Sequence, residues 1–162
     1  MSLIGLVHTI FSVVALIAGT AVVATRKGTR WHRTLGHLYL TSMLALNISA
    51  LFIGRLFGGF GPFHALAVYS LIILVVGMVP VLTRWPKRGW LRWHAAAISG
   101  SYVGLVAAFF AEITSRLPGL EQHFGLVVTV TSVVINAVGF YLILVYMPRI
   151  GNRLPARFRR AA

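Results

Sequence analysis

Five long apolar stretches alternate with short polar segments along this chain of 162 residues. Each is close to the roughly 20 residues with which an α-helix crosses a bilayer. They cover residues 3–25, 35–54, 63–82, 94–110 (extending to Glu112) and 124–147. Lipid offers the backbone no hydrogen-bond partners, and the sequence shows no alternating barrel pattern, so the pattern predicts an all-α membrane bundle. We expect five transmembrane helices, a four-helix core plus a fifth, C-terminal helix.

The positive charges fall mainly between alternate helices. Thirteen of the fifteen Lys and Arg residues lie in the first connection, the third connection and the C-terminal tail, all on one side of a five-span bundle. The first connection carries Arg26, Lys27, Arg30 and Arg33, and the two opposite connections carry only Arg55 and Arg116. The positive-inside rule predicts a cytoplasmic C-terminus and an N-terminus outside.

This charge pattern also predicts the domain organisation. The first stretch lacks a basic leader and a small-residue cleavage site, so we expect a retained helix and not a signal peptide. We expect a single transmembrane domain over residues 1–148 and a basic cytoplasmic tail over 149–162.

Composition excludes several classes of protein. The chain is 58% hydrophobic and 10% charged, with a mean hydropathy of +0.86, which excludes a soluble domain. The net charge of +13 would suggest nucleic acid in a soluble protein, but contact of one face with anionic lipid headgroups accounts for it. The lipid bilayer is therefore the expected partner, and no nucleic acid is expected. The absence of cysteine excludes disulfides and iron–sulfur clusters.

The candidate chemistry lies in the histidines, which fall near the N-terminal ends of successive predicted helices. Because neighbouring helices run antiparallel, the six histidines alternate between the two membrane faces. His8, His64 and His123 are expected near the outer face, and His32, His37 and His94 near the inner face. Ionisable residues near membrane spans mark functional sites. The positive end of the helix dipole favours the neutral imidazole, which is the metal-ligating form.

Haem is the first chemistry that fits this pattern. Alternate helices run parallel, so His8 can pair with His64 near the outer face, and His32 (or His37) with His94 near the inner face. Two b-type haems, each held by two imidazoles with no open iron position, predict a transmembrane electron-transfer protein, an oxidoreductase of the cytochrome b type. The aromatic side chain of Tyr102 is a candidate to pack against the haem macrocycle. A small anionic molecule or a quinone is the expected electron donor.

Zinc is the alternative chemistry. His8, His64, His123 and Glu112 could form an outer site of a zinc-dependent membrane hydrolase, with Glu112 as a ligand or general base. Glu112 could equally pair with Arg116 one turn later. The sequence also leaves open a transporter or scaffold without catalytic activity, and a homodimer.

Other polar and small residues predict helix packing. Asn47 and Asn136 are candidates for interhelical hydrogen bonds, and the GxxxG spacing of Gly100 and Gly104 predicts close helix packing or room for a flat cofactor.

Four segments resemble a bacterial family of predicted membrane proteins of unknown function: "KGTRWHRTLGHLY", "LALNISALFIG", "FGPFHALAVYSL" and "HAAAISGSYVGLVAAFFAE". The resemblance covers most of residues 8–112 and carries no activity. It implies the inner (plasma) membrane of a bacterium as the location. It implies a set of matched motif positions, from which His37 is excluded. They are His8, His32, Asn47, His64, His94, Tyr102 and Glu112.

A more distant resemblance is to the two-haem transmembrane cytochromes b that pass electrons from ascorbate-like donors. "KGTRWHRTLGH" is similar to the basic stretch that precedes two histidines in that family, and "PFHALAVYS" and "LRWHAAAISG" to its later ligand segments. In that family four consecutive helices each carry one ligand, and alternate helices pair. The resemblance implies His8, His32, His64 and His94 as haem ligands.

Overall fold

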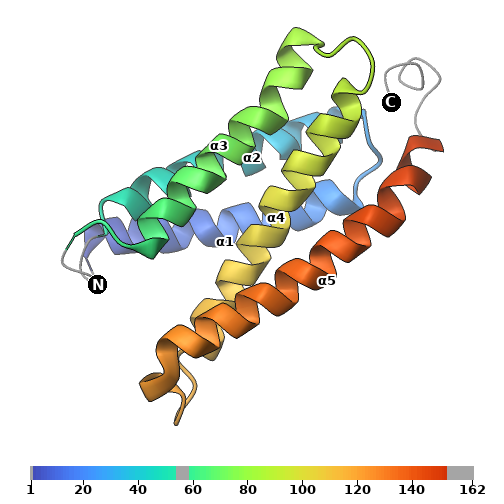
Figure 1. Ribbon diagram of the computed structural model, residues 1–162. Helices are drawn as coiled ribbons and strands as arrows, with labels where there is room; N and C mark the ends of the chain where they lie inside the picture. The colour runs from blue at the N-terminus through green and yellow to red at the C-terminus, as the bar shows by residue number, and fades with distance from the viewer. Residues whose placement is uncertain (1, 54–58, 153–162) are drawn as a thin grey trace.

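The computed structural model describes residues 2–53 and 59–152. These residues form five α-helices and one short 3-10 helix at Glu121–His123, which confirms the predicted all-helical architecture (Figure 1). The α-helices are α1 (Leu3–Ala24), α2 (Arg30–Leu51), α3 (Pro62–Thr83), α4 (Trp90–Thr114) and α5 (Phe124–Asn152). Arg55 and most of the predicted basic tail, from residue 153 onward, lie outside the described residues.

The first four helices form a ring of antiparallel neighbours. α1 packs extensively against α2, α2 against α3, α3 against α4, and α4 makes a smaller contact with α1. Alternate helices therefore lie diagonally across the ring, α1 opposite α3 and α2 opposite α4. The fifth helix packs along α4, and at one end of the molecule these two helices diverge from the other three (Figure 1).

Two helices begin earlier than their apolar stretches predict. The side chain of Thr29 caps α2 by accepting the backbone N–H of His32 at 3.2 Å, so the helix starts at Arg30 and not near residue 35. Arg30 and Arg33 therefore belong to the first turn of α2, which corrects their assignment to the connection. α4 starts at Trp90, directly after Gly89, whose φ of +85° favours glycine. Hydropathy marks where a helix enters lipid, whereas capping marks where it begins.

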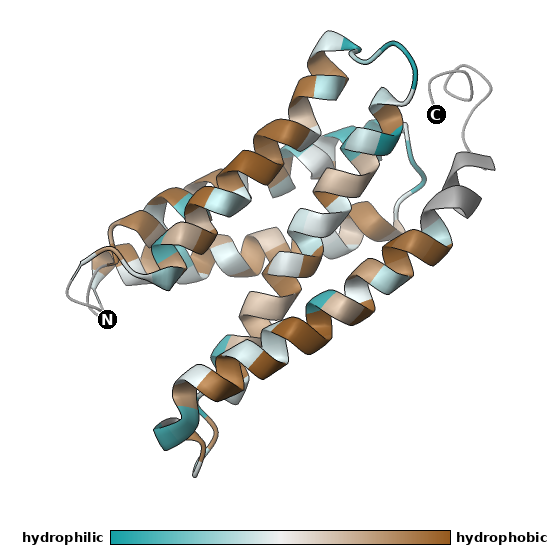
Figure 2. Ribbon diagram, viewed as in Figure 1, coloured by the Kyte–Doolittle hydropathy of each residue, from teal (hydrophilic) through white to brown (hydrophobic). Residues whose placement is uncertain are grey.

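The interior of the ring is small and well filled. Its largest fully buried side chains include Tyr39 and Leu74, and Ala15 and Ala18 of α1 let the neighbouring helices approach. From Phe124 to Tyr146, α5 buries no side chain completely. Apolar residues occur along all five helices (Figure 2), and many of their large side chains are exposed.

This apolar exterior fits a lipid environment. Four helices, α1, α3, α4 and α5 up to Tyr146, are long and apolar enough to cross a membrane. The second helix has the same 22-residue length as α1 but is less apolar, because its first turns carry polar and charged side chains. The chain is therefore an integral membrane protein, and its partner is a lipid bilayer.

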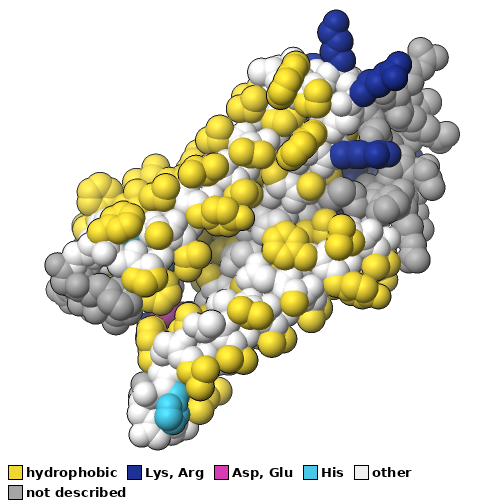
Figure 3. Space-filling model, viewed as in Figure 1, with side chains coloured by type: hydrophobic (Ala, Val, Ile, Leu, Met, Phe, Trp, Pro, Cys, Tyr) yellow, Lys and Arg dark blue, Asp and Glu magenta, His cyan; other side chains and the backbone are white. Residues whose placement is uncertain are grey.

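The cations of the first and third connections gather at one end of the bundle. The connections over residues 25–29 and 84–89 both lie at this end, and Lys and Arg side chains mark it in Figure 3. Arg84 ends α3 in a left-handed conformation, and its guanidinium lies 4.5 Å from the centre of the buried Trp90 ring. We call this end of the bundle, with its connections at 25–29 and 84–89, the basic end.

Candidate functional site

Two histidines on diagonally opposite helices lie near the basic end. His32 is the third residue of α2 and His94 the fifth residue of α4, on diagonally opposite helices. Each ring is partly buried, and the two are close enough for an electrostatic interaction. His37, the alternative inner candidate, has an exposed side chain one turn further along α2. The structure therefore brings together His32 and His94 and leaves His37 outside the pair.

A backbone carbonyl orients the ring of His94. Its Nδ1 lies 2.8 Å from the carbonyl oxygen of Gly77 on α3, so Nδ1 carries the proton and donates. Gly77 permits this approach, because a Cβ there would lie 2.7 Å from Cδ1 of Ile98 and 3.2 Å from Cβ of Ala97, both on α4. Metal-bound histidines commonly donate their second ring nitrogen to a carbonyl in this way. The arrangement leaves Nε2 of His94 free to act as a ligand.

The ring of His32 has a buried nitrogen without a partner. Its Nδ1 is shielded from solvent and makes no hydrogen bond to any of the described residues. A buried polar atom in this state costs free energy, which a bound ligand would recover. Imidazole nitrogens with free lone pairs, one on α2 and one on α4, are suited to the axial positions of a haem iron. His32 and His94 at the basic end therefore fit the predicted haem.

Lys27 lies beside this pair. Its Nζ donates to the carbonyl oxygens of Val22, Val23 and Thr25 at 2.8, 2.7 and 3.2 Å, which caps the C-terminal end of α1. The carbonyl of Val22 also interacts with the ring of His32, and the lysine charge acts directly on that ring. Burial lowers the pKa of the Lys27 ammonium from its ordinary value. No sequence motif reveals that Lys27 folds back onto the end of α1, so sequence reasoning did not place it beside His32.

At the opposite end, His8 has polar partners on two other helices. Its Nδ1 lies 3.2 Å from Oγ of Ser49 on α2, and Glu112 of α4 acts on it electrostatically. Glu112 also forms an ion pair with Arg116, as predicted from their spacing, and both side chains are exposed. This group links α1, α2 and α4, and none of the described contacts joins it to His64.

His64 has a local structural role. The backbone N–H of Gly61 donates to its Nδ1 at 3.0 Å and so caps α3, while the ring stacks on Phe60 with centroids 5.3 Å apart. Because Nδ1 accepts, the neutral ring carries its proton on Nε2. In this geometry neither nitrogen offers iron a lone pair. The outer pair, His8 and His64, therefore does not fit a haem as the inner pair does.

The zinc alternative gains no support from the described residues. Among them, no three histidine or acidic side chains are grouped closely enough to hold a metal ion. His123 lies in the short 3-10 helix before α5 with an exposed side chain. The four residues proposed for the site, His8, His64, His123 and Glu112, are thus not brought together.

Hydroxyl groups, one pair buried and one exposed, connect the helices between the two ends. The hydroxyl of Tyr39 lies 2.7 Å from Oγ of Ser101, and that of Tyr102 lies 2.7 Å from Oγ1 of Thr20. The two tyrosine rings meet edge to face. Tyr102 thus holds α1, α2 and α4 together at mid-height.

The candidate asparagines behave differently from the prediction. The side-chain amides of Asn47 and Asn136 donate to Met43 and Ser132, the carbonyls four residues earlier on their own helices. The predicted interhelical hydrogen bonds are not formed by these two amides.

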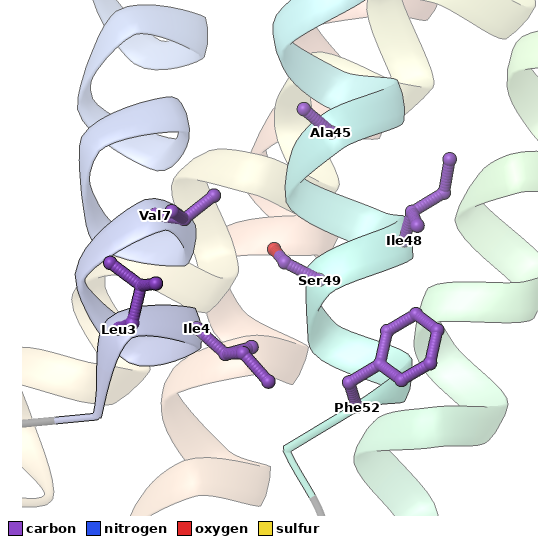
Figure 4. Close-up of a pocket in the computed structure, with 7 residues that line it drawn as sticks. All are labelled: Leu3, Ile4, Val7, Ala45, Ile48, Ser49 and Phe52. Carbon is purple, nitrogen blue, oxygen red and sulfur yellow. The ribbon is translucent and has the colours of Figure 1, made fainter.

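An apolar groove lies between α1 and α2 at the end opposite the cations (Figure 4). Its volume is about 360 Å³, and it is open to the outside of the bundle. Ser49 is the only polar residue among the seven that line it, and its hydroxyl is already engaged by His8 and by the carbonyl of Leu46. The groove therefore suits a hydrocarbon chain and offers no polar group for recognition.

Comparison with known proteins places the chain in a family without assigning an activity. No curated protein and no solved structure matches it. The family model DUF2306, described as "predicted membrane protein", matches residues 5–151, which include both histidine groups and nearly the whole of the five helices. The chain therefore belongs to the DUF2306 family of predicted membrane proteins.

Proposed function

We propose that this protein is a transmembrane electron-transfer protein that binds a b-type haem between α2 and α4, with His32 and His94 as axial ligands. The observation that carries the proposal is the pair of partly buried imidazoles at the basic end, which lie within electrostatic range of each other. One of them has an unpartnered buried nitrogen, and the other is oriented by the Gly77 carbonyl with its Nε2 free. The distant resemblance to two-haem cytochromes b supports the same two ligands.

Residues of the chain would position the haem in three ways. His94 is held in one tautomer by α3, so its ring is fixed before any ligand binds. The N-terminal cap of Thr29 places His32 in the first turn of α2, opposite His94. The surrounding helices exclude water from Nδ1 of His32. A haem held by two histidines supplies one-electron transfer without an open iron position.

The basic end would face the cytoplasm, with all five helices crossing the bacterial plasma membrane. Two observations support this orientation. The cations of both connections gather at one end, and the polar first turn of α2 lies among them, which explains why this helix is less apolar than its neighbours. The exposed cations at this end would attract an anionic electron donor.

The predicted second haem, between His8 and His64, stays a prediction. It requires His64 to give up the N–H of Gly61 and to turn away from Phe60. The proposal therefore rests on the inner pair.

The test is an absorption spectrum of protein purified from haem-supplemented cells, before and after dithionite. We expect wild type and His37→Ala to show a bis-histidine b-type spectrum. His32→Ala and His94→Ala should lose the haem of the inner pair, measured as haem per protein. Colourless wild-type protein, or full haem content and an unchanged spectrum in both ligand variants, would refute the proposal.

A further inference from the structure

We propose that Lys27 is a positioning residue that raises the reduction potential of a haem bound at His32 and His94 by holding a fixed positive charge beside the His32 ligand. The inference rests on the proposed haem site and goes beyond it, because it assigns to one lysine the control of the iron's preferred oxidation state.

The geometry holds the charge in place. Three carbonyl oxygens at the end of α1 receive hydrogen bonds from Nζ of Lys27. An ammonium group has three donors, whereas a neutral amine has two, so this set of acceptors matches the charged form. The side chain is partly buried, unlike the exposed Arg26, Arg30 and Arg33 around it. Its charge is therefore screened less by water and salt than those of its neighbours.

The charge of Lys27 also lies near the proposed ligand His32. Lys27 donates to the carbonyl of Val22 at 2.8 Å, and its charge lies within electrostatic range of the ring of His32. In the described structure no acidic side chain pairs with Lys27, since the ion pair there joins Arg116 to Glu112 at the other end. A fixed positive charge opposes the additional positive charge that iron carries in its ferric form. Lys27 should therefore favour the ferrous form.

A merely structural role for Lys27 would give a different result. Capping of α1 depends on hydrogen-bond donors, which glutamine can supply without charge, whereas the potential depends on charge, which arginine retains. The variants Lys27→Gln, Lys27→Met and Lys27→Arg separate the two roles. Arg33→Gln is the matched control, because it removes an exposed charge from the first turn of α2, directly next to His32.

The experiment is an equilibrium redox titration of each haem-loaded protein in detergent, with haem content measured separately. At the wild-type midpoint, we expect the ratio of ferrous to ferric haem to fall about three- to tenfold in Lys27→Gln and Lys27→Met, the order expected for one partly screened charge. Lys27→Arg and Arg33→Gln should change it less than about twofold, because neither alters a buried charge. A neutral variant that loses haem is reconstituted with added haem, and its midpoint is then measured in the same way.

Three outcomes would overturn the inference. The two neutral variants could retain haem with an unchanged midpoint, Arg33→Gln could shift the midpoint as much as they do, or Lys27→Arg could lose haem together with them. All three leave the haem site itself intact in wild type. Wild-type protein without haem would instead refute the proposed function, and this inference with it.

Discussion

Replacing Gly77 with alanine should disturb both the packing of α3 on α4 and the orientation of His94. The added Cβ would lie 2.7 Å from Cδ1 and 3.0 Å from Cγ1 of Ile98, and 3.2 Å from Cβ of Ala97. The shortest of these is 0.7 Å below the 3.4 Å at which ordinary contacts begin. Ile98 can move its terminal methyl group, but Cβ of Ala97 moves only with its helix.

The cost follows from these distances. Overpacking of a filled interior costs about 1–3 kcal/mol. Replacing a helical glycine with alanine in open space gains about 0.5–1 kcal/mol. We therefore expect Gly77→Ala to lower the free energy of unfolding by about 1–2 kcal/mol and to lengthen the hydrogen bond of 2.8 Å between His94 and residue 77.

The assay is equilibrium unfolding in detergent micelles, with Gly104→Ala as the matched control. Gly104 lies within α4, and a Cβ there meets nothing within 4 Å, so this variant should be as stable as wild type or more stable. In a Gly77→Ala background, Ile98→Val should restore part of the lost stability, because it removes the δ-methyl group that overlaps. If Gly77→Ala were as stable as Gly104→Ala, the close approach of α3 and α4 at His94 would be wrong.

Three further substitutions test separate parts of the structure. Tyr39→Phe should lower the free energy of unfolding by about 1 kcal/mol, because its hydroxyl partner is buried, and Tyr102→Phe, whose hydroxyl contact is more exposed, should lower it by less. Equal losses in unfolding experiments would contradict this ranking. Arg116→Ala should change stability by less than about 1 kcal/mol, since both it and Glu112 are exposed, and a larger loss in the same assay would mean that the pair is more than a surface contact.

The helices could be predicted from the sequence because apolar runs of membrane length have few alternative structures. Their first turns could not, because the residues that begin α2 and α4 are polar or aromatic. Thr29 and Gly89 fix these starts by capping and by backbone conformation, which hydropathy does not record. The five predicted stretches therefore identify the right helices with some wrong boundaries.

The candidate site was predictable in part. Antiparallel alternation alone predicts that His32 and His94 share one end of the bundle, and the structure brings their rings together. The alternation pattern does not predict that His64 caps its own helix, because that role depends on the conformation of Gly61. The same limit applies to Gly100 and Gly104, the predicted packing motif. The close approach of α4 and α5 occurs instead at Gly139, where a Cβ would overlap Val103.

The contribution of Gly77 had no signal in the sequence. It is one glycine in an apolar stretch, and its importance comes from Ile98 and His94 on another helix. Single-sequence reasoning can place a residue on a helix, but it cannot choose the partner helix or the side facing it. Residues that act through a neighbour's backbone are therefore found only when the packing is known.

The most direct test of the haem proposal is the haem content of the His94→Ala protein compared with wild type and His37→Ala, all purified together from haem-supplemented cells. We predict haem bound between α2 and α4 in wild type and His37→Ala, and its loss in His94→Ala. Wild-type protein that carries no haem, or a His94→Ala protein with the wild-type haem content and reduced spectrum, would contradict the proposal.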